Sequence, residues 1–241
     1  MVAVEGTKVL AELLEHGPPP QRLIYDLRAA AGEAVGDLVV AADRQGVPLE
    51  AVSPGVLDRL LDADTSQGVV GLVDRPAADP ASLLDGHAGG VPLLIGAGVQ
   101  DPGNVGTLVR IAAAAGGPGL LVDLNSADPW APKALRASAG WALRHPVAEI
   151  DDAASAVNRL VEGGTMVVAA APGGVPPEEI DWSGRTALVL GSEGQGVPSS
   201  VVAGCSQRVS IPMASGVESL NVAVAGAVVA FEAARQARIL S

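Results

Sequence analysis

The sequence of 241 residues is poor in cysteine, histidine and aromatic residues. Its single cysteine, Cys205, excludes an intrachain disulfide and any metal site built from cysteine pairs. We expect the three histidines, His16, His87 and His145, to be structural or surface residues, and we expect no bound metal. No apolar run approaches the roughly 20 residues that span a bilayer. Residues 1–6 lack the basic segment of a signal peptide. These absences predict a soluble, cytoplasmic protein without membrane contact.

Positive charge is also scarce. The chain has 15 Lys and Arg against 27 Asp and Glu, a formal net charge of −12. Residues 1–85 carry a net charge of −8 and residues 86–241 carry −4. Nucleic-acid-binding proteins usually have a basic footprint, because neutralised phosphates supply much of their affinity. The overall composition therefore argues against RNA binding, and any RNA contact must come from a local patch.

Small apolar residues, glycine and proline are abundant. Apolar residues make up 49% of the chain, and 30 Gly and 18 Pro are spread along it. Short apolar runs alternate with helical patterns, which is typical of α/β architecture with a largely parallel sheet. The segment DRPAADPASLLDGHAGG (residues 74–90) predicts a linker with at most one short helical turn. We therefore expect a first domain over residues 1–75, a linker over 76–90 and a second domain over 91–241.

The predicted elements follow from this periodicity. In the first domain they are helices over residues 7–15, 27–34 and 53–61 and strands over 22–25, 37–41 and 68–73. In the second domain they are strands over 91–95, 120–122, 165–170, 186–190 and 207–211 and helices over 104–115, 132–139, 151–162 and 219–238.

The first unusual segment is QDPGNVGTLVR, residues 100–110. Asp101 and Pro102 end the predicted strand, and Asn104 is at the start of the predicted helix, where its side chain can cap free N–H groups. Arg110 follows six residues later, and we expect it roughly on the side of Asn104. Taken alone, a capped helix with a surface arginine explains the segment equally well.

The second segment is LGSEGQGVP, residues 190–198, with three glycines after a buried strand. Gly191, Gly194 and Gly196 let the backbone approach a ligand closely. The segment is neither a Walker A loop nor a GxGxxG motif. The charge of Glu193 also argues against a phosphate cradle. The alternative is an ordinary turn from a strand to a helix.

The third segment is IPMASGVESLN, residues 211–221. Ser219 is predicted as the N-cap of the last helix, with Asn221 in the first turn. A capped helix with polar first-turn residues is the alternative. All three segments follow predicted strands, and open α/β sheets bind ligands at the carboxyl ends of their strands. Together they predict one shared ligand site.

In order and spacing, the three segments resemble the three motifs of the SpoU/TrmH branch of the SPOUT methyltransferases. Residues 128–147 resemble that family's intermediate segment of the form P-K-x-x-R-x-S-x-G. Residues 1–73 resemble its small ribosomal-protein-like domain, which ends in H-Q-G where this chain has Ser66-Gln67-Gly68. The resemblance implies a homodimer with a trefoil-knotted α/β catalytic domain preceded by a small α/β/α domain.

The resemblance also implies S-adenosylmethionine as the cofactor and attack of a ribose 2′-hydroxyl on its methyl group. The positions that match the family's catalytic set are Asn104, Arg110, Glu193, Ser219 and Asn221. Those expected to hold the cofactor are Ala170, Leu190, Gly191, Gly196, Ile211, Met213, Ser219 and Leu220.

The family's arginine has been assigned as the general base. A guanidinium stays protonated, with a pKa above about 12, so we expect Arg110 to clamp a phosphate of the RNA. Asn221 and Ser219 would orient the hydroxyl, and Glu193 would hold Arg110 or structure its loop. We also expect Lys133 and Arg136, with Arg144 nearby, to form a local basic cluster that binds substrate. The alternative for this cluster is a solvated helix face.

The expected partner is structured RNA, with ribosomal RNA favoured over tRNA by analogy with the ribosomal-protein-like domain. Some members of the family confer antibiotic resistance. The chain departs from the family in Ala97, where an acidic residue is frequent, in lacking the histidine of H-Q-G, and in its acidic first part. Two alternatives stay open. One is a knotted methyltransferase acting on tRNA or on a substrate other than RNA, and the other is a non-catalytic RNA-binding factor.

Overall fold

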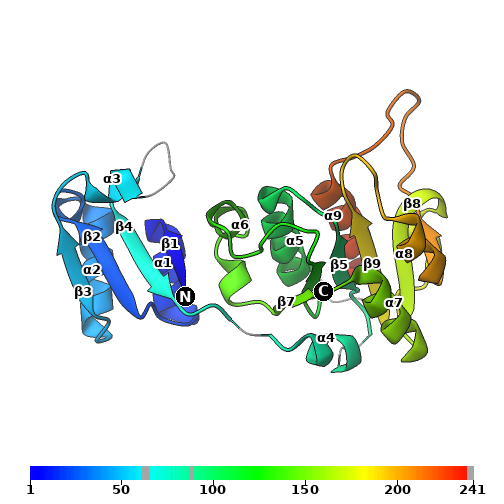
Figure 1. Cartoon of the computed structure of the whole chain (residues 1–241), viewed down its shortest axis with the longest axis horizontal. Coiled ribbons are helices and arrows are strands. Elements are labelled where there is room, and N and C mark those ends of the chain that lie inside the picture. The colour runs from blue at the N-terminus through cyan, green and yellow to red at the C-terminus, as the bar shows by residue number, and fades with distance from the viewer. Residues whose placement is uncertain (61–65, 77, 87–88, 238–241) are drawn as a thin grey trace. The chain divides into compact units, whose positions relative to one another are not determined.

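The computed structural model describes residues 1–60, 66–76, 78–86 and 89–237. The chain forms two compact units, Met1–Pro76 and Ala77–Ser241, which we describe separately. Figure 1 shows both as mixtures of helices and strands. No helix among the described residues combines the length and apolar character needed to cross a bilayer.

The first unit contains a four-stranded sheet in the order β1-β4-β2-β3. Strand β4 is antiparallel to both β1 and β2, and β2 is parallel to β3. Helices α1 and α2 contact one another and the sheet, and Leu10, Leu13 and Leu23 are fully buried between them. The elements are β1 (Val2–Glu5), α1 (Thr7–His16), β2 (Arg22–Asp26), the 3₁₀ turn η1 (Ala29–Ala31), α2 (Glu33–Arg44), β3 (Leu49–Val52), α3 (Val56–Leu60) and β4 (Val69–Val73).

The strand predicted over residues 37–41 is wrong, because these residues lie in α2. The run LVVA is apolar throughout, so its local pattern fits a strand. The residues that α2 buries are Val35, Leu38 and Ala42, spaced by three and four, which is the period of an amphipathic helix. The helix predicted over 27–34 is replaced by η1, and the short strands β1 and β3 were not predicted.

The second unit is built on a six-stranded sheet in the order β10-β8-β9-β5-β6-β7. Every neighbouring pair of strands is parallel, so the predicted α/β class with a parallel sheet is confirmed. The strands are β5 (Leu93–Ala97), β6 (Leu120–Asp123), β7 (Val147–Ile150), β8 (Met166–Val175), β9 (Thr186–Gly191) and β10 (Gln207–Val209). Strand β7 was not predicted, and β8 continues beyond its predicted end.

Helices cover both faces of this sheet (Figure 1). Helices α6 and α9 pack on α5 on one face, and α4 and α8 pack on α7 on the other. Because both faces are covered, all six residues of β9 are buried, which explains its unbroken apolar run. The helices are α4 (Pro80–Gly86), α5 (Pro102–Ala115), α6 (Pro132–Ala137), α7 (Ala153–Glu162), α8 (Ser199–Gly204) and α9 (Val222–Gln236), with 3₁₀ turns η2 (Trp141–Leu143) and η3 (Pro177–Glu179).

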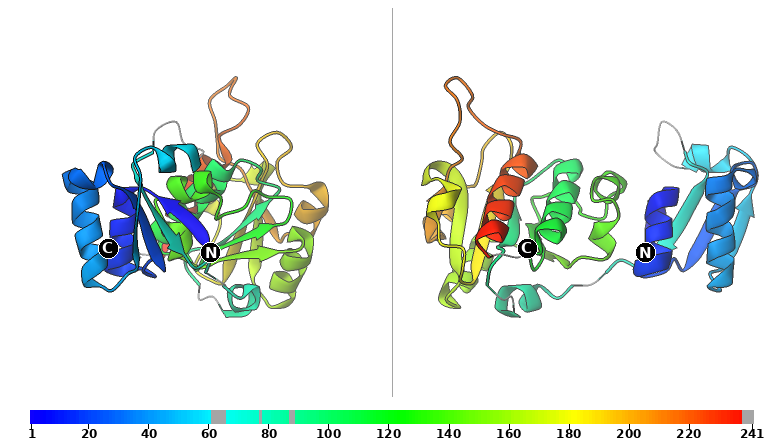
Figure 2. Two further views of the ribbon diagram at one scale, coloured as in Figure 1. Left: turned by 60° about the vertical axis from the view of Figure 1, so that its left-hand side comes forward. Right: turned by 180° about the vertical axis from the view of Figure 1, so that it is seen from behind.

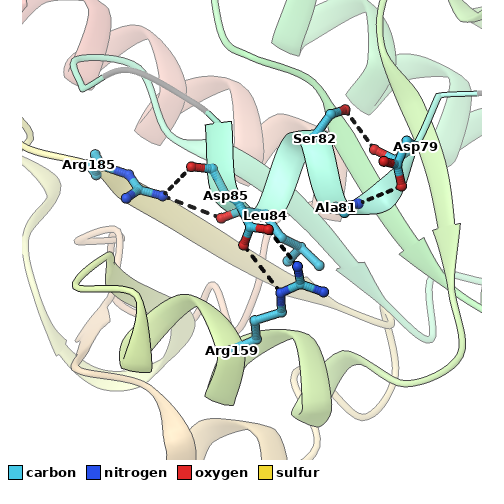
Figure 3. A network of polar contacts seen from close by, with 7 residues as sticks. All are labelled: Asp79, Ala81, Ser82, Leu84, Asp85, Arg159 and Arg185. Atoms are coloured by element: carbon cyan, nitrogen blue, oxygen red, sulfur yellow. Dashed lines mark hydrogen bonds and ion pairs between the residues drawn. The ribbon is translucent and has the colours of Figure 1, made fainter.

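The segment expected as a linker, residues 76–90, contains α4, which packs against the second unit. Leu83 and Leu84 are buried in the core cluster on the α7 face of the sheet. Figure 3 shows the polar contacts around them. Arg159 of α7 donates to both carboxylate oxygens of Asp85, at 3.2 and 2.5 Å, and Arg185 donates to the carbonyl oxygens of Leu84 and Asp85. Burial of these two leucine side chains holds the Pro- and Ala-rich segment against the second unit.

Candidate active site

The three unusual segments leave the same edge of the six-stranded sheet. They follow β5, β9 and β10, and the carboxyl ends of parallel strands share one edge. The neighbours β5 and β9 send their connections to opposite faces, since β5 leads into α5 and β9 leads into α8. The chain therefore has a topological switch point between β5 and β9, which is where open α/β sheets bind ligands.

One side chain from each segment joins a chain of hydrogen bonds. The Asn221 side-chain amide donates from Nδ2 to Oδ1 of Asn104, at 3.0 Å. Asn104 in turn donates from Nδ2 to the Glu193 carboxylate. The Asn221 oxygen is occupied separately, because it accepts from the backbone N–H groups of Ala223 and Val224 at 3.0 and 3.2 Å. The start of α9 thus sets the direction of every donor in the chain.

Two capping predictions are wrong. Asn221, and not Ser219, is the N-cap of α9. Asp101, and not Asn104, is the N-cap of α5, where its Oδ1 accepts from the Gly103 N–H at 2.6 Å and Pro102 occupies the first turn. Asp101 immediately precedes the helix and can accept from its first N–H groups, whereas Asn104 lies three residues later, inside the helix. Asn104 is therefore free to reach the loop after β9.

Arg110 and Ser219 do not join this cluster in the structure. Arg110 is exposed on α5, and six residues of helix place it about 9 Å along the axis from Asn104 and about 120° around it, not on the same side. Glu193 bonds to Asn104, and no ion pair joins it to Arg110 in the described part of the chain. Ser219 is exposed in the segment between β10 and α9.

The loop after β9 folds back on itself. The Gly196 N–H donates to the Ser192 carbonyl at 2.9 Å, and a Cβ added at Gly191 would lie 2.0 Å from the Gly196 carbonyl carbon. Glycine at position 191 is therefore required by the chain's own close approach. Leu190 is 1% exposed, and a Cβ added at Gly226 of α9 would lie 3.0 Å from its Cδ1. The Leu190 side chain therefore packs against α9 and is not available to a ligand.

The segment between β10 and α9 extends beyond the sheet, in orange in Figures 1 and 2. Ile211 is half-buried, while Met213 and Leu220 are 39% and 38% exposed. Strand β8, the neighbour of β10, has a register shift that begins at Ala170. Its pairing with β10 passes from Ala169 directly to Val175. Exposed apolar side chains beside irregular backbone suit a nucleoside that is bound by stacking and by backbone hydrogen bonds.

Lys133 makes an ion pair within the chain. Its Nζ lies 2.9 Å from Oδ2 of Asp101. The hydrogen bond from Lys133 and the N–H of Gly103 lower the pKa of Asp101. Helix α6 approaches α5 closely here, since a Cβ added at Gly106 would lie 2.2 Å from the Ala134 carbonyl oxygen. Arg136 is exposed in the next turn.

Two residues that hold the first loop were not predicted. The Asp123 carboxylate is buried and accepts from the Gly98 N–H at 2.9 Å and from the Ser126 hydroxyl at 2.7 Å. The Ser126 oxygen accepts from the Val99 N–H at 3.0 Å. An Asp directly after a predicted strand, with Ser three residues later, is the pattern that indicates such a turn.

The described residues contain no cluster of His, Cys, Asp or Glu able to hold a metal ion.

Family models match both units. Residues 92–231 match the SpoU rRNA Methylase family, and residues 3–78 match a model described as RNA 2′-O ribose methyltransferase substrate binding. A protein of Mycolicibacterium paratuberculosis described as an uncharacterized tRNA/rRNA methyltransferase is 35% identical over 239 residues, which cover 98% of this chain and 77% of that protein. A protein of Mycobacterium sp. (strain KMS) with the same description is 36% identical over 241 residues, 98% of this chain and 76% of that protein.

Two solved structures extend the similarity to the whole fold. The SpoU methyltransferase AviRb from Streptomyces viridochromogenes, in complex with AdoMet, is 28% identical, with a TM-score of 0.81 and coverage of 99% of this chain and 91% of that chain. An rRNA methyltransferase from Sinorhizobium meliloti is 28% identical, with a TM-score of 0.80 and coverage of 97% and 86%. The expected family is thus confirmed: this chain belongs to the SpoU rRNA Methylase family and is an RNA methyltransferase of that family.

Proposed function

We propose that this chain transfers a methyl group from S-adenosylmethionine to a ribose 2′-hydroxyl in structured RNA, with ribosomal RNA preferred over tRNA. The observation that carries the proposal is the chain of hydrogen bonds from Asn221 through Asn104 to Glu193 at the switch point of the sheet. The substrate-binding model that matches residues 3–78 is described for ribose 2′-O methylation, which supports the ribose oxygen as the acceptor. The rRNA methyltransferase of S. meliloti supports ribosomal RNA.

S-adenosylmethionine supplies a methyl group made electrophilic by the sulfonium. The residues proposed to hold it, through backbone groups and exposed apolar side chains of these loops, are Ala170, Leu190, Gly191, Gly196, Ile211, Met213, Ser219 and Leu220. The task left to the chain is to place a weakly nucleophilic hydroxyl in line with that group. The new bond joins the 2′-oxygen to the methyl carbon, the bond from sulfur to that carbon breaks, and the hydroxyl proton leaves late, to solvent.

Asn221 and Ser219 are proposed to orient the 2′-hydroxyl, and Glu193 to fix the loop after β9. Arg110 is proposed to clamp a phosphate next to the target ribose. A guanidinium cannot accept a proton at neutral pH, but it can bind two phosphate oxygens at once. The side chains of Arg110 and Asn104 lie on different sides of α5. The bound RNA, or a second copy of the chain, must therefore connect the phosphate at Arg110 with the site at Asn104.

Replacing Arg110 tests the clamp. We expect Arg110→Ala to reduce methyl transfer by at least two orders of magnitude while cofactor affinity, measured by calorimetry, stays near the wild-type value. Arg110→Lys keeps the charge but loses two-point binding, so it should restore only a small part of the activity. Full activity in Arg110→Ala would exclude the clamp and the general-base assignment alike.

The reaction itself is tested with labelled cofactor and total RNA, followed by mapping of the 2′-O-methylated nucleotides. Label in a ribose of ribosomal RNA supports the proposal, and label in tRNA alone would mean that tRNA is the substrate.

The net charge of −8 over residues 1–85 favours a second candidate, a substrate other than RNA. Absence of any affinity for RNA at low salt would favour that candidate, because phosphate contacts are strongest there.

We also propose that the functional form is a homodimer. Val224, Val228 and Phe231 are 49%, 42% and 38% exposed and follow one another on one face of α9. The residues of α9 that face the sheet are buried on the opposite side. An exposed apolar stripe beside an extended loop is typical of a surface that a second copy covers.

A further inference from the structure

Among the stretches of this acidic chain that lack Asp and Glu, one carries three basic residues. Residues 129–148 have no Asp or Glu, but they contain Lys133, Arg136 and Arg144. The stretch runs through α6 and η2 on the face of the sheet that α5 covers. Burial lowers the pKa of His145, so the positive charge comes from the lysine and the arginines. A polyanion, which the acidic surface of the rest of the chain repels, is attracted electrostatically to this stretch.

Trp141, in the same stretch, is the one tryptophan of the three that is exposed. Trp130 and Trp182 are 4% and 0% exposed, and the indole N–H of each donates to a backbone carbonyl, at 3.1 and 3.0 Å. Trp141 is 37% exposed, and the Arg144 guanidinium lies 4.6 Å from the centre of its ring. More than a third of Trp141 is thus open to solvent, where a second flat group can stack on it.

The stretch begins beside the hydrogen-bonded cluster. Lys133 lies against Asp101 at the start of α5, three residues before Asn104. Lys133 and Arg136 are three residues apart on α6 and share one of its faces. After α6 the chain turns into η2, which also contacts α5 and carries Trp141. Lys133 and Arg136 on α6 and Trp141 on η2 thus all lie on elements that pack against α5.

We propose that Trp141 and Arg144 form a stacking platform for an unpaired base of the RNA, with Arg136 on the phosphate backbone leading to the target ribose. Unpaired bases are recognised by stacking on aromatic rings and guanidinium planes, beside cations that follow the phosphates. The platform rests on the proposed function, because it assumes an RNA substrate. It assigns this chain's selectivity for single-stranded nucleotides to the catalytic unit and explains how an acidic protein holds RNA.

The fluorescence of Trp141 gives a direct test. Iodide should quench Trp141 in the free protein and leave the buried Trp130 and Trp182 largely unaffected. A short single-stranded oligoadenylate, added without cofactor, should quench the emission further and protect Trp141 from iodide. The variant Trp141→Phe should lose both signals and still bind the labelled oligonucleotide, because a phenyl ring also stacks.

Affinity measurements complete the test. Trp141→Ala should weaken binding of the labelled oligoadenylate by about fivefold to a hundredfold, the range that one stacked base contributes. Arg136→Ala should lower the slope of log affinity against log salt by about one phosphate contact. Arg208→Ala, an exposed arginine outside the stretch, is the matched control and should leave that slope unchanged. Circular dichroism melting checks that each variant is folded.

The outcomes separate the platform from the reaction. An indole that iodide cannot reach in the free protein overturns the platform, as does wild-type affinity in a folded Trp141→Ala variant. Equal quenching by polyglutamate would point to an acidic protein partner and also overturns it. Trp141-dependent RNA binding supports the platform even if no methyl transfer is detected, in which case only the proposed reaction fails.

Discussion

Each asparagine of the site has an orientation that its neighbours dictate. Asn221 must present its oxygen to the N–H groups of α9, so its Nδ2 donates to Asn104. Asn104 must then accept with its oxygen, which leaves its Nδ2 for the Glu193 carboxylate. An amide is the one side chain of this size that can accept at one atom and donate at the other. The requirement for Asn at position 104 is therefore chemical as well as steric.

A pair of substitutions tests this chain of donors. Asn104→Asp keeps the acceptor for Asn221 but places a second carboxylate against Glu193, so we expect methyl transfer to fall at least tenfold. Adding Glu193→Gln should recover part of the loss, because the glutamine amide donates to the new carboxylate. The coupling between the two changes should be about 1 to 3 kcal/mol, from rates of methyl transfer in a double-mutant cycle. Additive losses would show that the two side chains act separately.

The sequence indicated the residues of this cluster better than their local roles. The resemblance to the family's motifs predicts Asn104, Glu193 and Asn221 as site residues, and hydrogen bonds join all three in the structure. It could not separate a capping side chain from one that reaches another loop, because Ser, Asp and Asn all favour helix starts. The segment predicts a strand end at Asp101, although an Asp before a Pro in the first turn is also a strong N-cap signal.

At the scale of elements, the hydrophobic pattern of the sequence predicts strands correctly where helices cover both faces of the strand. It fails where an apolar run is short and fits a helix as well. The unbroken apolar run of β9 has one interpretation inside a parallel sheet. The run over residues 37–41 fits a strand or a helix until Val35 and Ala42 are known to share its buried face. Composition likewise marked residues 74–90 as a linker, because Pro, Ala and Gly outnumber Leu83 and Leu84 in it.

Helix α4 offers a prediction at this scale. Leu84 is 7% exposed in the core cluster, so Leu84→Ala should lower the free energy of unfolding of the second unit by about 2 to 5 kcal/mol. Asp85→Ala removes only the exposed ion pair with Arg159 and should cost less than about 1 kcal/mol. Urea unfolding of both variants in the full chain measures the difference. Equal, small effects would mean that α4 is a linker and not part of the core.

At the scale of the whole molecule, the net charge of −12 is divided evenly between the two units, with −6 in residues 1–76 and −6 in residues 77–241. Among the stretches that lack acidic side chains, residues 129–148 contain the most Lys and Arg. Length, charge and hydropathy predicted a soluble α/β protein, but they could not reveal which surfaces stay exposed. That depends on which side of α9 faces the sheet. The helix is apolar on nearly all sides, so its period alone does not separate the buried face from the exposed one.

The exposed face of α9 leads to the prediction for the assembly. Wild-type protein should sediment with twice the chain mass of 24.0 kDa, and Val228→Asp should sediment as a monomer, because a buried carboxylate in an apolar contact is strongly unfavourable. Val40 of α2 is also an exposed helical valine, at 48%, so Val40→Asp is the matched control and should stay dimeric. If the two copies jointly build the site around the exposed loop before α9, the monomeric variant should also lose methyl transfer. A wild-type protein that is monomeric at every concentration would leave Val224, Val228 and Phe231 without the partner we propose, and the site would then have to work within one chain.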